Sequence, residues 1–116
     1  MAAQRHAEVS EDDVERILRR DYPEADLTEL RALIRHINIR EKPRVVAACL
    51  KNAGGSSQRL RKELEDAPGY YREILSEAEY PTATKRWSSI DKLSDSERQQ
   101  IYDKDWAQYQ EWFARP

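Results

Sequence analysis

The chain of 116 residues has one cysteine, two histidines and three glycines, and it lacks long apolar runs. Its single cysteine, Cys49, permits no disulfide within the chain, which is typical of a reducing, cytoplasmic setting. No apolar run is long enough for a membrane span, and no apolar signal-peptide core follows the first residue. We therefore expect a soluble cytoplasmic protein.

Histidine is equally scarce, which limits the chemistry that the chain can carry. His6 and His36 are the only two, and neither has a cysteine or carboxylate at the spacing of metal ligands. The run 54–57 resembles the end of one helix and the start of the next, because it lacks the lysine of a phosphate-binding loop. Cys49 lies within the apolar run 45–50, where a core position is expected. These observations predict no enzyme activity, no catalytic residue, no metal and no cofactor.

Glycine is rare, with three residues, and no stretch alternates apolar and polar residues as a strand does. We expect an all-α fold, a compact bundle of five or six helices in a single helical domain over residues 10–116. Residues 1–9 are expected to form a flexible N-terminus. Capping boxes begin the first helix at Ser10 and the last at Ser94. A second helix is expected over about 25–38, and a third begins at Pro43 and ends near Gly54-Gly55. A fourth, capped by Ser56 or Ser57, extends to a break at Pro68-Gly69. A fifth is defined by Tyr70, Tyr71, Ile74, Leu75 and Ala78. The stretch 80–94 is a loop or one helical turn, with Trp87, Ile90 and Leu93 as possible anchors.

The charge of the chain is unevenly distributed although its total is only −2. Residues 31–62 contain nine basic side chains and one acidic, whereas both flanking regions are acidic. The segment 31–62 is therefore a candidate surface for an anion or a nucleic acid. The candidate residues are Arg31, Arg35, Arg59, Arg61 and Lys62. Its charges can equally pair with the acidic flanks when the chain folds.

Two helices joined by the Gly54-Gly55 turn resemble a helix-turn-helix, and the second opens with polar and basic residues. Phosphate contacts by lysine and arginine would supply the affinity. The overall pI near 5.8 is low for a DNA-binding domain, and Leu50 or Lys51 stands where that motif has a small residue. A nucleic-acid-binding regulator is thus the alternative prediction, not the leading one.

The C-terminal helix gathers five of the ten aromatic residues in the chain. On a helical wheel they share one arc of about 140°. This face either packs on the rest of the bundle or contacts another protein or a second copy of the chain. The candidate interface residues are Trp106, Tyr109, Trp112, Phe113 and Asp105. Asp105 falls within the aromatic arc, so we expect a buried or half-buried pair that ties the helix to the basic segment.

The stretch 44–81 resembles small uncharacterised bacterial proteins that are entirely helical. The resemblance is carried by the apolar helix over 44–51, by Gly54-Gly55, and by the helix end Ala78-Glu79-Tyr80-Pro81. The chain departs from that pattern at Asn52-Ala53 and at Pro68-Gly69. The resemblance implies a bacterial, cytoplasmic, helical protein and carries no activity to transfer. From the residues themselves, our leading prediction is a non-catalytic protein–protein interaction module that contacts a protein partner or itself.

Overall fold

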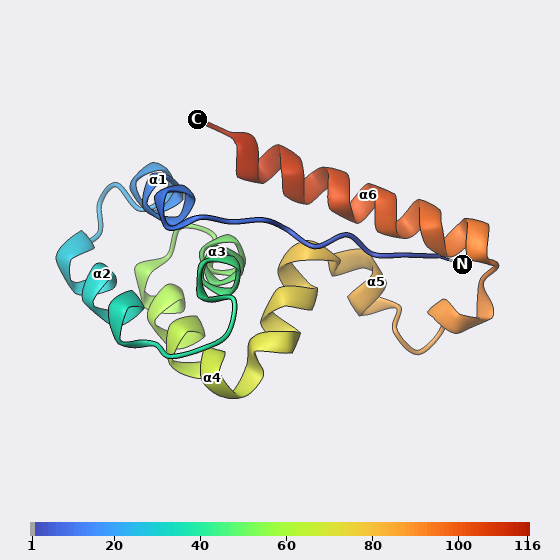
Figure 1. Ribbon diagram of the computed structural model, residues 1–116, viewed down its shortest axis with the longest axis horizontal. Helices are drawn as coiled ribbons and strands as arrows, with labels where there is room; N and C mark the ends of the chain where they lie inside the picture. The colour runs from blue at the N-terminus through green and yellow to red at the C-terminus, as the bar shows by residue number, and fades with distance from the viewer. Residues whose placement is uncertain (1) are drawn as a thin grey trace.

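A computed structural model describes residues 2–116 of the chain (Figure 1). Its elements are α1 (Glu11–Asp21), α2 (Leu27–His36), α3 (Lys42–Ala53), α4 (Ser57–Glu79), α5 (Pro81–Lys85), a 3-10 turn η1 (Ile90–Lys92) and α6 (Asp95–Ala114). The described residues contain no strand. The predicted all-α bundle with a long, aromatic-rich C-terminal helix is therefore confirmed.

Local capping chemistry sets the start of four helices, among them α2, where the Asp26 carboxylate accepts from the Glu29 backbone N–H at 3.3 Å. At α1 the Ser10 hydroxyl accepts from the Asp13 backbone N–H at 3.1 Å, and the Asp13 carboxylate accepts in return from the Ser10 backbone. Ser94 begins α6 with the same reciprocal pair, and Ser56 caps α4. Each cap satisfies backbone N–H groups that have no partner within the first turn of the helix. This is why the predicted starts of α1 and α6 are correct.

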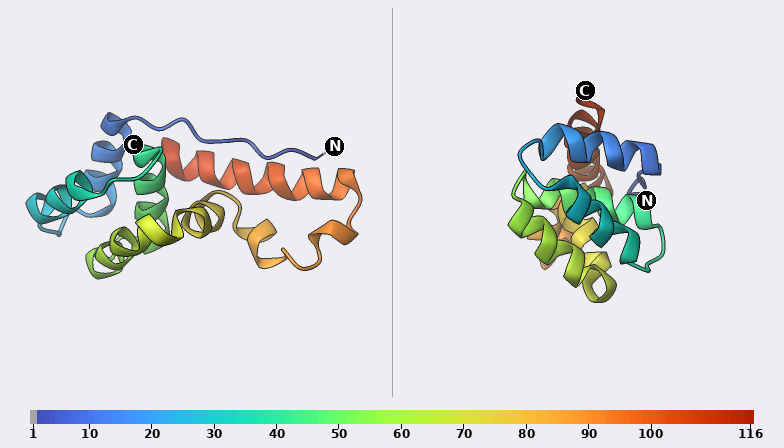
Figure 2. Two further views of the ribbon diagram at one scale, coloured as in Figure 1. Left: turned by 60° about the horizontal axis from the view of Figure 1, so that its bottom comes forward. Right: turned by 90° about the vertical axis from the view of Figure 1, so that its left-hand side faces the viewer.

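Helix α3 is the central element of the core and packs against α1 and α4, which gather with α2 at one end of the molecule (Figure 2). Every residue from Val45 to Leu50 is buried, so α3 is apolar nearly all round rather than along one stripe. Cys49 is fully buried here, and burial raises the pKa of its thiol to about 12. The expected core position of Cys49 is confirmed.

The predicted break at Pro68-Gly69 is a kink within one long helix. Helix α4 continues through Pro68, and Tyr70 has non-helical dihedral angles of φ −130° and ψ 25°. A proline inside a helix removes one backbone donor and clashes with the carbonyl one turn earlier, which bends the helix. The predicted interruption at Pro68-Gly69 is therefore found, as a kink at Tyr70 between two helical pieces that share the label α4.

The stretch 80–94 contains the short helix α5 and the single turn η1, in agreement with the expected loop or helical turn. Ile90 is buried and Leu93 is half-buried, so both pack inward as predicted. Trp87 does not, because 75% of its surface is exposed. The expected anchoring role of Trp87 is wrong.

Helix α6 closes a second, smaller apolar cluster with Tyr80, Ala83 and Ile90. Its C-terminal end is fixed to α1 by two arginines. Arg16 donates to the Phe113 and Arg115 carbonyls at 2.7 and 2.6 Å, and Arg20 donates to the Trp112 carbonyl at 2.9 Å. The Trp112 carbonyl also accepts from the Arg115 backbone N–H at 3.3 Å, and the cations favour the negative end of the helix dipole.

Residues 2–9, the N-terminal segment, run extended along α6 in the same direction as that helix (Figure 1). The side chains of Ala3, Gln4, Arg5 and His6 are exposed, and Val9 packs against the main core. The predicted flexibility of this segment stays a prediction about its motion. Residues 6–8 of this segment lie beside the aromatic residues of α6.

Candidate functional site

A groove with an apolar floor lies between α1, α2 and α3. Val14, Ile34, Pro43 and Val46 form the floor, and the cavity has a volume of about 270 Å³. Val14 and Val46 are buried at 7% and 1% exposure, whereas Ile34 is only half-buried. A cavity of this size holds one or two apolar side chains rather than a large ligand.

The two sides of the groove carry opposite charges. On one side Glu15 of α1 accepts a hydrogen bond from the Arg31 Nε at 3.0 Å, and this contact lowers the pKa of the Glu15 carboxyl. On the other side Arg35 is exposed and the Lys42 Nζ donates to the Arg35 backbone carbonyl at 3.1 Å. No carboxylate within residues 2–116 forms an ion pair with Arg35 or Lys42. Two of the cations that line the groove are thus available to an anionic group.

The other basic candidates do not join this pair. Arg61 binds Glu29 with its Nε 2.9 Å from a carboxylate oxygen, and Lys62 lies 3.7 Å from Asp66. Arg59 is exposed on the first turn of α4. Arg31 contacts Glu15 in the same way. Three of the five predicted basic residues, Arg31, Arg61 and Lys62, therefore contact carboxylates of their own chain. The structure brings Arg31 and Arg35 together at the groove and leaves the remaining three on α4.

The aromatic residues of α6 pack mostly on one another and on the bundle. Tyr109 is buried at 2% exposure, and its ring lies 5.9 Å from Trp106 and 5.5 Å from Trp112, centroid to centroid. Arg20 stacks over Trp112 and Arg16 over Phe113. Trp106, Trp112 and Phe113 remain half-buried. A partner on this face stays a prediction.

Asp105 is buried, as predicted, but its partner is different. Its two carboxylate oxygens accept from the backbone N–H groups of Thr82 and Ala83 at 3.2 and 3.0 Å. Asp105 therefore satisfies the free N–H groups at the start of α5 and ties α6 to that helix. No direct ion pair between Asp105 and the basic segment is found among the described residues, although the charge of Asp105 acts on Lys51 of that segment.

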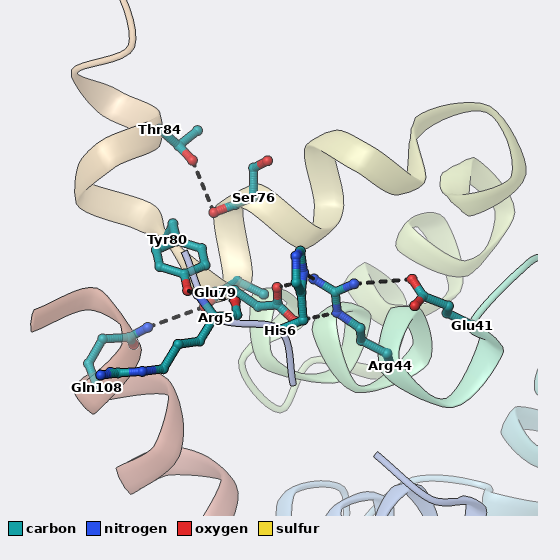
Figure 3. Close-up of polar contacts among 10 residues, drawn as sticks. Arg5, His6, Glu41, Arg44, Ser76, Glu79, Tyr80, Thr84 and Gln108 are labelled. Carbon is teal, nitrogen blue, oxygen red and sulfur yellow. Dashed lines mark hydrogen bonds and ion pairs between the residues drawn. The ribbon is translucent and has the colours of Figure 1, made fainter. Parts of the chain in front are cut away.

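A buried ion pair joins α3 to the end of α4 (Figure 3). Arg44 donates from Nε and Nη2 to the two carboxylate oxygens of Glu79 at 2.8 and 2.6 Å. Glu79 is 2% exposed, and the pKa of Arg44 is raised chiefly by this contact. Arg44 also contacts Glu41 at 3.1 Å and the His6 Nδ1 at 3.0 Å. No pattern in the sequence identifies Arg44 as the partner of Glu79.

Within residues 2–116, no three His, Cys, Asp or Glu side chains gather closely enough to hold a metal ion. None of the described helices combines the length and apolar character that a membrane crossing requires.

Comparison with known proteins adds no further constraint. No protein family, curated protein or solved structure matches this chain.

Proposed function

We propose that this chain is a non-catalytic protein-interaction module whose groove between α1, α2 and α3 receives an acidic amphipathic segment of a partner protein. One observation carries the proposal. The groove joins an apolar floor to two cations, Arg35 and Lys42, that have no carboxylate partner in the part of the chain that is described. An apolar cavity anchors a partner side chain, and adjacent cations select carboxylates and fix the orientation. The lone buried thiol of Cys49 fits the cytoplasmic location that we also propose.

The charges around the groove define how the partner would lie. Glu11 and the paired Glu15 stand on the α1 side, so carboxylates of the partner are repelled there. The acidic face of the partner therefore points toward α2 and the start of α3. An amphipathic helix meets these demands when it places leucine or isoleucine on the floor and glutamate beside Arg35 and Lys42.

Nucleic-acid binding by segment 31–62 is the alternative, and the ion pairs count against it. A phosphate at Arg31, Arg61 or Lys62 has to compete with Glu15, Glu29 or Asp66. Displacing a carboxylate reduces the gain from each phosphate contact. For this reason the protein-binding function is preferred.

The test is an NMR titration of the ¹⁵N-labelled full-length protein with a synthetic amphipathic peptide that carries leucine at i, i+3, i+4 and i+7 and glutamate elsewhere. Amide shifts should concentrate at Val14, Ile34 and Val46. The double variant Arg35→Glu/Lys42→Glu should bind at least about tenfold more weakly. The control Lys85→Glu/Lys92→Glu makes the same change of charge at exposed positions outside the groove and should bind normally. Equal weakening by both variants, or shifts confined to α4, would overturn the proposal.

A further inference from the structure

The N-terminal segment is held to the α6 side of the molecule chiefly through its backbone. The Gln99 side-chain amide accepts from the Ala3 N–H at 2.8 Å and donates to the Ala3 carbonyl at 3.2 Å. The Tyr80 hydroxyl accepts from the Arg5 N–H at 2.5 Å and donates to the Arg5 carbonyl at 2.6 Å. Two side chains thus each satisfy both backbone groups of one residue in an extended peptide.

The spacing of these contacts matches the repeat of an extended chain. Residues 3 and 5 are two apart, and in an extended chain such residues present their backbone groups to the same side. Both contacting side chains are fixed by neighbours. The Tyr80 ring packs edge-on against Tyr102 with centroids 5.8 Å apart, and Gln99 donates to Asp103 at 2.9 Å. Backbone recognition of this kind depends little on the side chains of the bound peptide.

Selectivity comes from two polar contacts beside the backbone. Asp103 lies 3.6 Å from the Arg5 guanidinium, which favours arginine at this position. Arg44 can only donate, so the His6 Nδ1 that lies 3.0 Å away acts as acceptor. The recognised pattern is therefore an arginine followed by a residue whose side chain accepts a hydrogen bond.

The N-terminal segment is attached weakly enough to be replaced. The side chains of residues 3–6 are exposed, and the Arg5 and Asp103 side chains are 60% and 50% exposed. Exposed ion pairs and hydrogen bonds each stabilise little, because water competes for the same groups. Between residues 6–8 and the aromatic side of α6 a groove of about 550 Å³ remains open. The segment therefore does not seal the surface beneath it.

We propose that the surface formed by Gln99, Asp103, Tyr80 and Arg44 is a binding site for an extended peptide of a partner protein, which the N-terminal segment occupies within its own chain. The peptide has an arginine opposite Asp103 and a hydrogen-bond acceptor in the next side chain. This site is separate from the groove between α1, α2 and α3 and does not depend on it.

The experiment measures binding of a fluorescent, N-acetylated peptide with the sequence of residues 2–10 to the full-length protein. The wild type should bind weakly, because its own segment competes at high effective concentration. Arg5→Asp places a carboxylate opposite Asp103, and the repulsion between the two weakens the attachment of the N-terminal segment. This variant should therefore bind the peptide about tenfold more tightly than the wild type does. Adding Tyr80→Phe to Arg5→Asp keeps the ring but removes the hydroxyl, and should reverse most of that gain.

A charge exchange supplies the matched control. In a second peptide, aspartate replaces the arginine that corresponds to Arg5. The Asp103→Arg variant should bind this second peptide more tightly, because the exchanged charges attract. The Arg5→Asp variant keeps Asp103 and should bind the original peptide more tightly. The double variant Arg5→Asp/Asp103→Arg restores the pair within the chain and should bind both peptides as weakly as the wild type does. The proposal is overturned if Arg5→Asp binds no peptide or if both single variants bind the two peptides equally. Light scattering also tests whether the Arg5→Asp variant forms dimers. If it does, and the peptide does not dissociate them, the surface binds a second copy of the chain and the proposal is overturned.

Discussion

Replacing Arg44 by methionine should destabilise the protein by about 3–5 kcal/mol, because it leaves the Glu79 carboxylate buried without a cation. Glu79→Gln should cost less, about 1–3 kcal/mol. Arg44 is 12% exposed and keeps its contact with Glu41, whose side chain is 65% exposed, so its charge is not left without a partner. The asymmetry between the two single variants follows from the difference in burial of the two charges.

The double variant Arg44→Met/Glu79→Met separates burial of charge from packing. Well-packed apolar residues replace a buried ion pair at little net cost, so the double variant should be within about 1–2 kcal/mol of the wild type. Urea unfolding followed by far-UV circular dichroism gives the three free energies of unfolding and their coupling. The reasoning is refuted if Arg44→Met costs less than about 1 kcal/mol or if the cost of the double variant equals the sum of the singles.

Three other predictions concern single side chains. Asp105→Ala should lower the free energy of unfolding by about 2–4 kcal/mol, because two N–H groups of α5 lose their acceptor. The control Asp103→Ala changes an exposed position and should lower it by less than about 1 kcal/mol. Thermal unfolding compares the two variants. Cys49 should not react with a thiol reagent at pH 8 until the protein unfolds, because burial raises its pKa to about 12, and fast labelling of the native protein would contradict this. Burial also raises the pKa of Glu63 above its ordinary value of 4.5, so its ionisation reduces stability as the pH rises through the folded pKa. Glu63→Gln should therefore raise the free energy of unfolding at pH 7 and not at pH 3.5, as measured by urea unfolding at both pH values. An equal increase at pH 7 and pH 3.5 would exclude burial of the Glu63 charge as the cause.

The parts of the fold that depend on local chemistry could be predicted from the sequence. Ser10 and Ser94 begin helices because each forms a capping box with a residue three positions later, and that interaction needs no distant partner. The apolar run that contains Cys49 likewise indicated the core helix. The interruption at Pro68-Gly69 was likewise predicted, because a proline removes a backbone donor, and the kink at Tyr70 directly follows these residues.

The candidate sites depend on contacts between distant residues, which the sequence does not specify. The partner of Asp105 is a helix start more than twenty residues away, and Gln99 binds the backbone of Ala3 across most of the chain. Backbone recognition leaves no pattern of side chains to find. The basic segment was visible as a run of charge, but only the fold shows that Arg35 faces an apolar groove and that Arg61 faces Glu29.

Capture of a partner from a cell lysate by three immobilised proteins tests the central claim most directly. The three are the wild type, Arg35→Glu/Lys42→Glu and the control Lys85→Glu/Lys92→Glu, all with nuclease present and with bound proteins quantified by mass spectrometry. The account predicts a discrete protein that the wild type and the control retain equally and the groove variant loses by about tenfold or more. Retention that does not depend on Arg35 and Lys42, or that vanishes with nuclease in the wild type, would contradict a protein-binding groove between α1, α2 and α3.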